Sequence, residues 1–197
     1  MSDSPILLFD VMSTLVYDPI AAEIPAFFDL PLPELFRIKH PTAWVDFEHG
    51  ELSEEHFYEL FLPEPHGPVD GEKLRDTLFQ AYRWLEGIEP LLADLQQAQV
   101  PMHTLSNYPV WYELIEARLN LSRYLPWTFV SCNTGVRKPD PQAYAGAART
   151  LGVVPQRCIF IDDRPDNCQA ARQVGMGAIT FEHASQLRAE LQIRGVL

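Results

Sequence analysis

Acidic, hydroxyl and basic side chains follow short apolar runs at four places in the sequence. Apolar runs of this kind are typical of buried strands in a parallel sheet. Because an open parallel sheet binds its ligands at the carboxyl ends of its strands, we expect these side chains to meet in one crevice. The residues are Asp10, Ser106 with Asn107, Lys138, and Asp162 with Asp163.

The carboxylates in this set are suited to phosphoryl transfer. Asp10 could attack phosphorus as a nucleophile and form an aspartyl phosphate, or it could bind a hard cation such as Mg²⁺. Several carboxylates in one crevice repel each other, and a magnesium ion bound by Asp10, by Asp162 or Asp163, and by a backbone carbonyl would relieve this repulsion. Lys138 and Ser106 could then hold the phosphoryl oxygens, on which charge develops during transfer.

Each of these residues also has a purely structural interpretation. Asp10 could stabilise a turn, and Lys138 could be a solvated loop lysine. Ser106, Asn107 and Asp163 could cap the helices that follow them. The functional interpretation is favoured because all of these residues lie just beyond a predicted strand.

Composition and charge limit the possible partners. The 197 residues are 47% hydrophobic and 21% charged, which suffices for one sizeable core and a small second module. The formal net charge of −12 argues against binding to nucleic acid or to anionic membranes. A small phosphorylated metabolite stays compatible with this charge, because a metal ion and a few cations can reverse the local field. No sequence feature indicates an oligomeric state.

The cysteines and the N-terminal segment predict a cytoplasmic protein. Cys132, Cys158 and Cys168 are odd in number and widely spaced, so they fit neither a disulfide framework nor a zinc site. The segment 1–5 carries no basic region before its short apolar run, unlike a signal peptide. No apolar run approaches the roughly 20 residues of a membrane span.

From residue 87 onward, strand patterns alternate with helix patterns. This alternation predicts an α/β fold with a parallel sheet and right-handed crossovers. Strands are expected at residues 6–10, 100–105, 127–132, 158–161 and 178–181, and helices at 90–97, 111–119, 141–152, 167–174 and 186–193.

Residues 19–86 differ in character from the rest of the chain. They are rich in aromatic and acidic residues and show several short helix patterns but no strand pattern. One helix is expected to end at Gly50, and a longer one is expected at 72–86. We therefore predict a Rossmann-like core formed by residues 1–18 and 87–197, with a small inserted all-helical cap at 19–86. Most of the aromatic side chains are expected to pack inside the cap.

The polar groups lie in segments that resemble the four motifs of the haloacid dehalogenase-like hydrolase superfamily. The segments follow the family order and span the chain: LFDVMSTL at 8–15, TLSN at 104–107, RKPDP at 137–141 and IFIDDRPDN at 159–167. The resemblance implies a Rossmann-like core with a helical cap, a magnesium ion, and hydrolysis of small phosphate monoesters through a phosphorylated Asp10.

The resemblance also implies a role for each matching residue. Asp10, Ser106 and Lys138 would be catalytic. The substrate-binding residues would be Ser13, Thr14, Asn107 and Lys138. The magnesium ligands would be Asp10, the backbone carbonyl of Met12, Asp162 and Asp163.

Three further segments resemble a narrower group, the plant chloroplast flavin mononucleotide hydrolases. They are FFDLPL at 27–32, KHPTAWVDFE at 39–48 and SNYPVWY at 106–112. Their aromatic residues would suit a flat isoalloxazine ring, although aromatic residues also fill protein cores. Flavin mononucleotide (FMN) is therefore a possible substrate.

Met12 departs from the family pattern. Most phosphatases of the superfamily have a second aspartate two positions after the nucleophile, which protonates the leaving alkoxide and then activates water. Methionine donates no proton, and the hydroxyl of Ser13 is a poor substitute. Losing such an acid typically costs ~10²–10⁴-fold in rate. Water or a cap histidine, His40, His49 or His56, could replace it.

Three functions are compatible with this departure. The first is a phosphatase with slow turnover of poor leaving groups. The second is a non-catalytic protein that binds a phosphometabolite on the same fold. The third is a 2-haloacid dehalogenase, because a halide leaves without a proton; the Asp162–Asp163 pair argues against it, since dehalogenation requires no metal.

Overall fold

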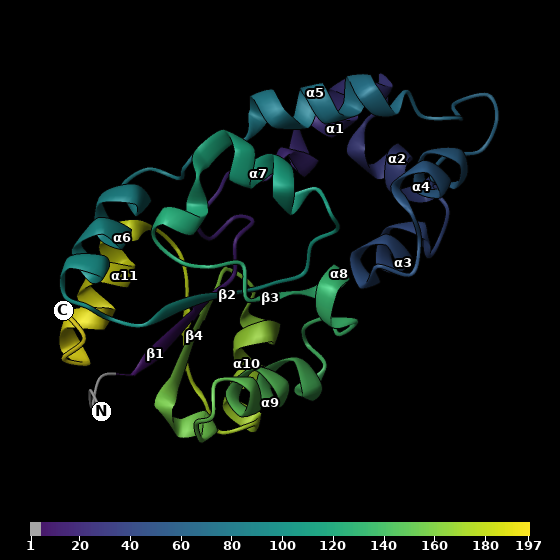
Figure 1. Cartoon of the computed structure of the whole chain (residues 1–197). Coiled ribbons are helices and arrows are strands. Elements are labelled where there is room, and N and C mark those ends of the chain that lie inside the picture. The colour runs from purple at the N-terminus through teal and green to yellow at the C-terminus, as the bar shows by residue number, and fades with distance from the viewer. Residues whose placement is uncertain (1–4) are drawn as a thin grey trace.

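The computed structural model of the protein describes residues 5–197. Its centre is a five-stranded parallel sheet with the strand order β3-β2-β1-β4-β5 (Figure 1). This architecture confirms the predicted α/β class. Residues 1–4 lie outside the described part of the chain. The sequence predicts that they belong to the core and not to a signal peptide. The strands are β1 (Ile6–Phe9), β2 (Met102–Ser106), β3 (Phe129–Val130), β4 (Cys158–Asp162) and β5 (Gly177–Thr180).

Strand β1 is apolar throughout because both faces of the sheet are covered. It pairs with β2 and β4, so that Leu8 lies opposite His103 and Phe160. Leu7 and Phe9 pack into the larger hydrophobic cluster, and Leu8 packs into the smaller one. Helices α6 (Ile88–Gln97), α7 (Tyr112–Leu119) and α11 (Ala184–Ile193) contribute to the larger cluster, and α9 (Pro141–Thr150) and α10 (Pro165–Gln173) to the smaller one.

A group of short helices separates β1 from α6, as the sequence predicts. Figure 1 shows these helices at one end of the molecule, apart from the sheet. Asp18, Ser53 and Asp70 accept hydrogen bonds from backbone N–H groups at helix starts, and Gly50 ends α3 at a left-handed φ of 76°. The elements are the 3-10 helix η1 (Pro19–Ala21), α1 (Glu23–Phe28), α2 (Leu32–Ile38), α3 (Ala43–His49), α4 (Glu54–Leu60) and α5 (Gly71–Ala81). We call them the helical insertion; the domain limits at 18/19 and 86/87 stay a prediction.

Helix α3 is attached to the core at several points. It packs against the short helix α8 (Ser131–Thr134), beside which it lies in Figure 1. The Ser131 hydroxyl donates a 2.5 Å hydrogen bond to the carbonyl oxygen of Glu48, and the Glu48 carboxylate lies 2.5 Å from the Arg137 guanidinium. At Gly50, an added Cβ would lie 2.3 Å from the Cys132 carbonyl oxygen, so no side chain fits there.

Aromatic side chains form the interior between the helical insertion and the core. Phe57 lies 4.7 Å from both Phe47 and Phe61, measured between ring centroids. Trp111, which precedes α7 of the core, joins this cluster at 5.1 Å from Phe47. The expectation that these aromatics serve mainly for packing therefore agrees with the structure.

Two elements are shorter than the sequence predicts. Helix α5 ends at Ala81 and not at residue 86, because the chain from 82 onward is extended and pairs with the segment after β1. There the N–H of Tyr17 donates to Arg83 and the N–H of Leu85 donates to Leu15. Strand β3 covers only Phe129–Val130, and the chain then turns into α8, where Ser131 bonds to α3. Both differences arise from tertiary contacts that override a local pattern.

Candidate active site

A lysine and two aspartates form a buried cluster at the carboxyl ends of the strands. The Lys138 ammonium lies 2.7 Å from a carboxylate oxygen of Asp10 and 2.7 Å from one of Asp162. All three residues are buried, with exposed fractions of 3%, 8% and 0% for Lys138, Asp10 and Asp162. The sheet brings the aspartates together because β1 and β4 are neighbours and the Asp10 N–H donates to the Ile161 carbonyl.

Asn107 holds Lys138 in this position. Its side-chain amide donates to the Lys138 carbonyl oxygen and accepts from the Lys138 N–H, both at 2.8 Å. The sequence predicts Asn107 as a substrate-binding residue. In the structure both polar atoms of the Asn107 side chain bind the backbone of Lys138, so Asn107 positions this lysine. Its role in substrate binding stays a prediction.

Asp162 is held by a residue that the sequence analysis did not single out. The Asn167 amide donates to both Asp162 carboxylate oxygens at 3.0 Å, and the Arg164 N–H donates to one of them at 2.8 Å. Asn167 lies in α10, five residues after Asp162, and is buried. In the sequence, an asparagine near the start of a helix resembles a capping residue, so its contact with Asp162 could not be predicted.

The loop after Asp10 is closed by its own backbone. Ser13 has a left-handed φ of 58°, and its N–H donates to Val16 while that of Thr14 donates to Val11. The Thr14 hydroxyl accepts from the Asp163 N–H at 3.1 Å, which links this loop to the end of β4. The backbone N–H groups of Ser13 and Thr14 therefore have acceptors within this loop, and the predicted role of these two residues in substrate binding stays a prediction.

Ser106 has a buried hydroxyl without a hydrogen-bond partner among the described residues. The residue is only 2% exposed and ends strand β2. Leaving a buried hydroxyl unpaired costs ~1–3 kcal/mol, so such a group in a native site is suited to a ligand oxygen.

Burial dominates the electrostatics of the cluster. It raises the pKa of Asp10 to about 7, with Lys138 lowering that pKa and Asp162 and Asp163 raising it. For Lys138 burial acts in the opposite direction, but the two neighbouring aspartates outweigh it and the pKa is raised. Burial and the neighbouring Asp162 also raise the pKa of Asp163. Burial, together with repulsion between the carboxyl groups, thus outweighs the single lysine.

The same carboxylates fit a divalent cation. Asp10, Asp162 and Asp163 each offer a ligand atom, and these atoms lie within 4.8 Å of one another. Carboxylate oxygens are the ligands that Mg²⁺ prefers, and the ion would relieve the repulsion that raises the pKa values of Asp10 and Asp163. The structure thus brings together the three carboxylates that the sequence predicts as magnesium ligands.

A cavity of about 210 Å³ lies between the helical insertion and the core, beside this cluster. Met12, two residues after Asp10, and Asn107, which holds Lys138, contribute to its wall, whereas Asp10, Lys138 and Asp162 do not line it. Its other wall residues are mostly aromatic or aliphatic, with two acids and one lysine: Asp18, Ile20, Ile24, Phe28, Leu35, Phe36, Lys39, Trp44, Glu48, Phe57, Phe61, Leu74, Tyr108 and Trp111.

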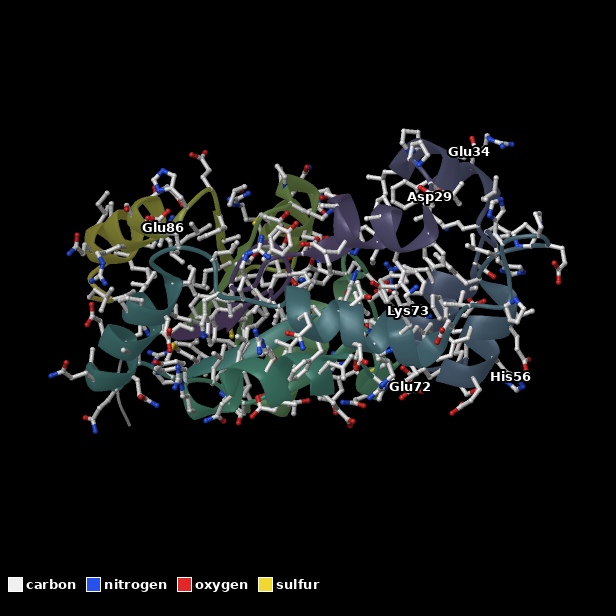
Figure 2. The ribbon with its side chains drawn as sticks, turned by 90° about the horizontal axis from the view of Figure 1, so that it is seen from above. Asp29, Glu34, His56, Glu72, Lys73 and Glu86 are labelled. Carbon is white, nitrogen blue, oxygen red and sulfur yellow. The ribbon has the colours of Figure 1, made fainter. Side chains whose placement is uncertain are left out.

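The histidines considered as replacements for the missing acid do not line this cavity. His40 accepts hydrogen bonds from the N–H groups of Thr42 and Ala43 and thereby caps α3. His56 lies on the outer edge of the helical insertion (Figure 2). His49 lies 3.9 Å from Glu51. The structure therefore does not support a catalytic role for a cap histidine.

Comparison with known proteins gives a family match and an extensive sequence relative. The model of the haloacid dehalogenase-like hydrolases matches residues 6–175. The chain is 44% identical over 192 residues to the chloroplastic flavin mononucleotide hydrolase 1 of Arabidopsis thaliana, covering 98% of this chain and 78% of that protein.

Solved structures share the fold at low sequence identity. A HAD-family enzyme of Bacteroides thetaiotaomicron, solved with magnesium and inorganic phosphate, superposes with a TM-score of 0.76 at 17% identity, covering 91% of this chain and 95% of that one. The L-2-haloacid dehalogenase of Xanthobacter autotrophicus superposes with a TM-score of 0.63 at 17% identity, covering 98% and 84%. Phosphate-binding and dehalogenating relatives share this fold, so the fold alone does not separate the two reactions.

Proposed function

Because this chain belongs to the haloacid dehalogenase-like hydrolases, we propose that it hydrolyses small phosphate monoesters in a magnesium-dependent reaction through a phosphorylated Asp10. The observation that carries the proposal is the buried cluster of Asp10, Lys138 and Asp162. The unpaired Ser106 hydroxyl, at the end of the neighbouring strand β2, adds a free donor at the same edge of the sheet. A nucleophile, a cation and a free donor are the groups that phosphoryl transfer needs. The family match and the relatives confirm the predicted class, a phosphoric monoester hydrolase.

Magnesium would be held by Asp10, Asp162, Asp163 and the backbone carbonyl of Met12. When bound, the ion supplies positive charge that offsets the charge of the phosphoryl oxygens. The fit of the carboxylate cluster supports this part of the proposal, as does the magnesium in the solved relative from B. thetaiotaomicron.

In the first step an Asp10 carboxylate oxygen attacks phosphorus, and the bond from phosphorus to the ester oxygen breaks. The Lys138 ammonium and the Ser106 hydroxyl orient the phosphoryl oxygens. In the second step water attacks the phosphorus of the aspartyl phosphate, which releases inorganic phosphate and restores Asp10. The helical insertion covers the site and restricts the entry of bulk water.

FMN is the substrate that the observations favour. The cavity beside Asp10 has aromatic walls that suit a flat ring system, and Lys39 adds a cation to the wall. The chloroplastic hydrolase of A. thaliana, 44% identical to this chain, is named for FMN. Within residues 5–197 no helix has the length and apolar composition to cross a membrane. The cytoplasmic location stays a prediction, since that relative is chloroplastic.

The test is phosphate release from FMN and from p-nitrophenyl phosphate, with magnesium and with a chelator. The Asp10→Asn variant should show no release from either compound, because an amide is a poor nucleophile. Asp29→Asn, which changes an exposed acid of the helical insertion (Figure 2) in the same way, should behave as the wild type.

Other outcomes would point to the other functions. Release of phosphate by Asp10→Asn at the wild-type rate would overturn the proposal. Thermal stabilisation by FMN without turnover would favour a binding protein; a ligand at 100 times its dissociation constant adds ~2.7 kcal/mol. Halide release from a 2-haloacid in the presence of a chelator would favour a dehalogenase.

A further inference from the structure

The cavity wall contains two carboxyl groups that could take over the proton transfer for which Met12 is unsuited. They belong to Asp18 and Glu48. Met12 is 92% buried and shares the wall with both. A leaving group that extends from the phosphate at Asp10 into the cavity would therefore pass Asp18 or Glu48. Either could replace the aspartate that most family phosphatases carry at position 12. This inference rests on the proposed function.

Glu48 is already committed to another contact. One of its carboxylate oxygens lies 2.5 Å from the Arg137 guanidinium, and its backbone carbonyl accepts from Ser131. Burial raises the pKa of Glu48, while the nearby cations Arg137 and Lys138 act in the opposite direction and favour its carboxylate form. The contacts of Glu48 thus attach α3 to the core and direct its carboxylate toward Arg137.

The folding of the segment after β1 brings Asp18 to the cavity wall that also contains Met12. The chain turns back so that Met12 and Val16 form a bridge, and the Tyr17 N–H then donates to the Arg83 carbonyl. The Asp18 side chain accepts one hydrogen bond, from the Ile20 N–H at 3.0 Å through Oδ1. Within residues 5–197 the structure shows no ion pair for this carboxyl, so its second oxygen is available to a ligand in the cavity.

We propose that Asp18 is the general acid and base of the reaction. In the first step its carboxyl group gives a proton to the ester oxygen as the bond to phosphorus breaks, so the product leaves as an alcohol and Asp18 becomes a carboxylate. In the second step this carboxylate takes a proton from the water that attacks the aspartyl phosphate. Phosphate leaves, Asp10 is restored, and Asp18 is again protonated.

The surroundings of Asp18 favour its protonated form. Burial raises its pKa, the Ile20 N–H lowers it, and the nearby acids Asp163 and Glu23 raise it. Two phenols also face it, those of Tyr82 and Tyr108, which share a 2.7 Å hydrogen bond and stay neutral because burial raises their pKa values. No cation acts on Asp18 in this set, in contrast to Glu48.

The test compares two leaving groups in the Asp18→Asn variant. The ribityl oxygen of FMN needs a proton to leave, whereas p-nitrophenolate does not. We expect the first-turnover rate with FMN to fall ~10²-fold or more and that with p-nitrophenyl phosphate to stay within about threefold. The later turnovers of p-nitrophenyl phosphate should slow, because hydrolysis of the aspartyl phosphate loses its base. An equal fall of both first-turnover rates would mean a structural role and would overturn the proposal.

Two further variants keep the test independent of folding. Asparagine caps helices as well as aspartate does, so Asp18→Asn should keep the melting temperature and the affinity for inorganic phosphate with magnesium. Glu48→Gln is the matched control on the same cavity wall and should not change the ratio of the two first-turnover rates. Met12→Asp in the Asp18→Asn background should restore FMN turnover at least tenfold; no gain in folded protein would contradict the proposal.

A titration provides a readout that needs no turnover. Carboxyl ¹³C NMR of the wild type and of Asp18→Asn should differ by one aspartate signal that titrates above the ordinary range. If no such signal were lost in Asp18→Asn, or if the lost signal titrated in the ordinary aspartate range, the assignment of Asp18 would be overturned. Wild-type protein without any phosphatase activity would instead overturn the proposed function, so the two failures are distinguishable.

Discussion

The two sides of the active site are built in different ways. At the strand ends, Asp10, Lys138 and Asp162 are buried and joined directly to each other, and asparagines fix their positions. On the opposite side, the cavity wall is mostly apolar, and its residues come from many separate helices. The first side determines the reaction at phosphorus, and the second determines which leaving group fits and how it receives a proton. Changes at the strand ends should therefore lower the turnover of every substrate, whereas changes on the cavity wall should alter the KM for FMN or the dependence of the rate on the leaving group.

The largest effect is expected from Lys138→Met. The change removes the cation between Asp10 and Asp162, so two buried carboxylates lose their common partner. Breaking a buried pair costs about 3–5 kcal/mol of stability, and activity should fall ~10³-fold or more with every substrate. Denaturant unfolding and phosphate release measure both quantities. Lys39→Met, on the cavity wall, is the control: if it reduced p-nitrophenyl phosphate turnover as much, the two sides would not be separate.

A gain of activity is expected from Met12→Asp. An acid at this position could protonate the leaving alkoxide in addition to Asp18, so turnover of FMN should rise a few-fold, less than in the Asp18→Asn background. Turnover of p-nitrophenyl phosphate should change much less in its first step, because that leaving group needs no proton. Steady-state and first-turnover rates on both compounds measure the effect. Correctly folded Met12→Asp protein with unchanged FMN turnover would contradict our account of this position.

Magnesium affinity should depend on pH near neutrality. The metal-free protein holds Asp10 with a pKa of about 7, so below that pH a proton must leave before the carboxylate binds the ion. Apparent affinity should therefore rise about tenfold per pH unit up to about pH 7 and level off above it. Calorimetric titrations between pH 5.5 and 8.5 measure this, and a flat profile would be inconsistent with Asp10 as a ligand.

The smallest effect is expected from Phe36→Ala. Phe36 lines the cavity but is 51% exposed, so its loss should change stability by less than ~0.5 kcal/mol. The KM for FMN should rise a few-fold, while that for p-nitrophenyl phosphate should stay unchanged. Leu60→Ala, at 47% exposure and away from the cavity, is the control and should leave both KM values unchanged. Equal effects of Phe36→Ala on both compounds would argue against FMN as the favoured substrate.

The strand-end side could be predicted from the sequence because each of its residues follows its own apolar strand. The order of strands in a parallel sheet then brings Asp10, Ser106 and Asp162 to one edge without further information. The family and the α/β fold were predicted from the same segments and are confirmed. Local patterns are sufficient where one strand positions one residue.

The cavity side could not be predicted in the same way. Asp18 resembles a helix-capping residue in the sequence, and in the structure it is one; its place on the cavity wall follows from the pairing of residues 15–17 with 83–85. The same long-range pairing ends α5 before its predicted limit. The support of Asp162 by Asn167 was missed for a related reason: Asn167 ends the segment IFIDDRPDN, but the segment alone does not show that its amide contacts Asp162.

The attachment of α3 to the core has a consequence for the local stability of the helical insertion. The Ser131 hydrogen bond, the Arg137 ion pair and the close contact at Gly50 all act on this one helix. Helix α2 carries the half-exposed Phe36 on the cavity wall. We expect the amide hydrogens of α2 to exchange with solvent faster than those of α3. Substrate would then enter through local opening of α2, while α3 keeps its place and the cavity floor stays assembled between turnovers.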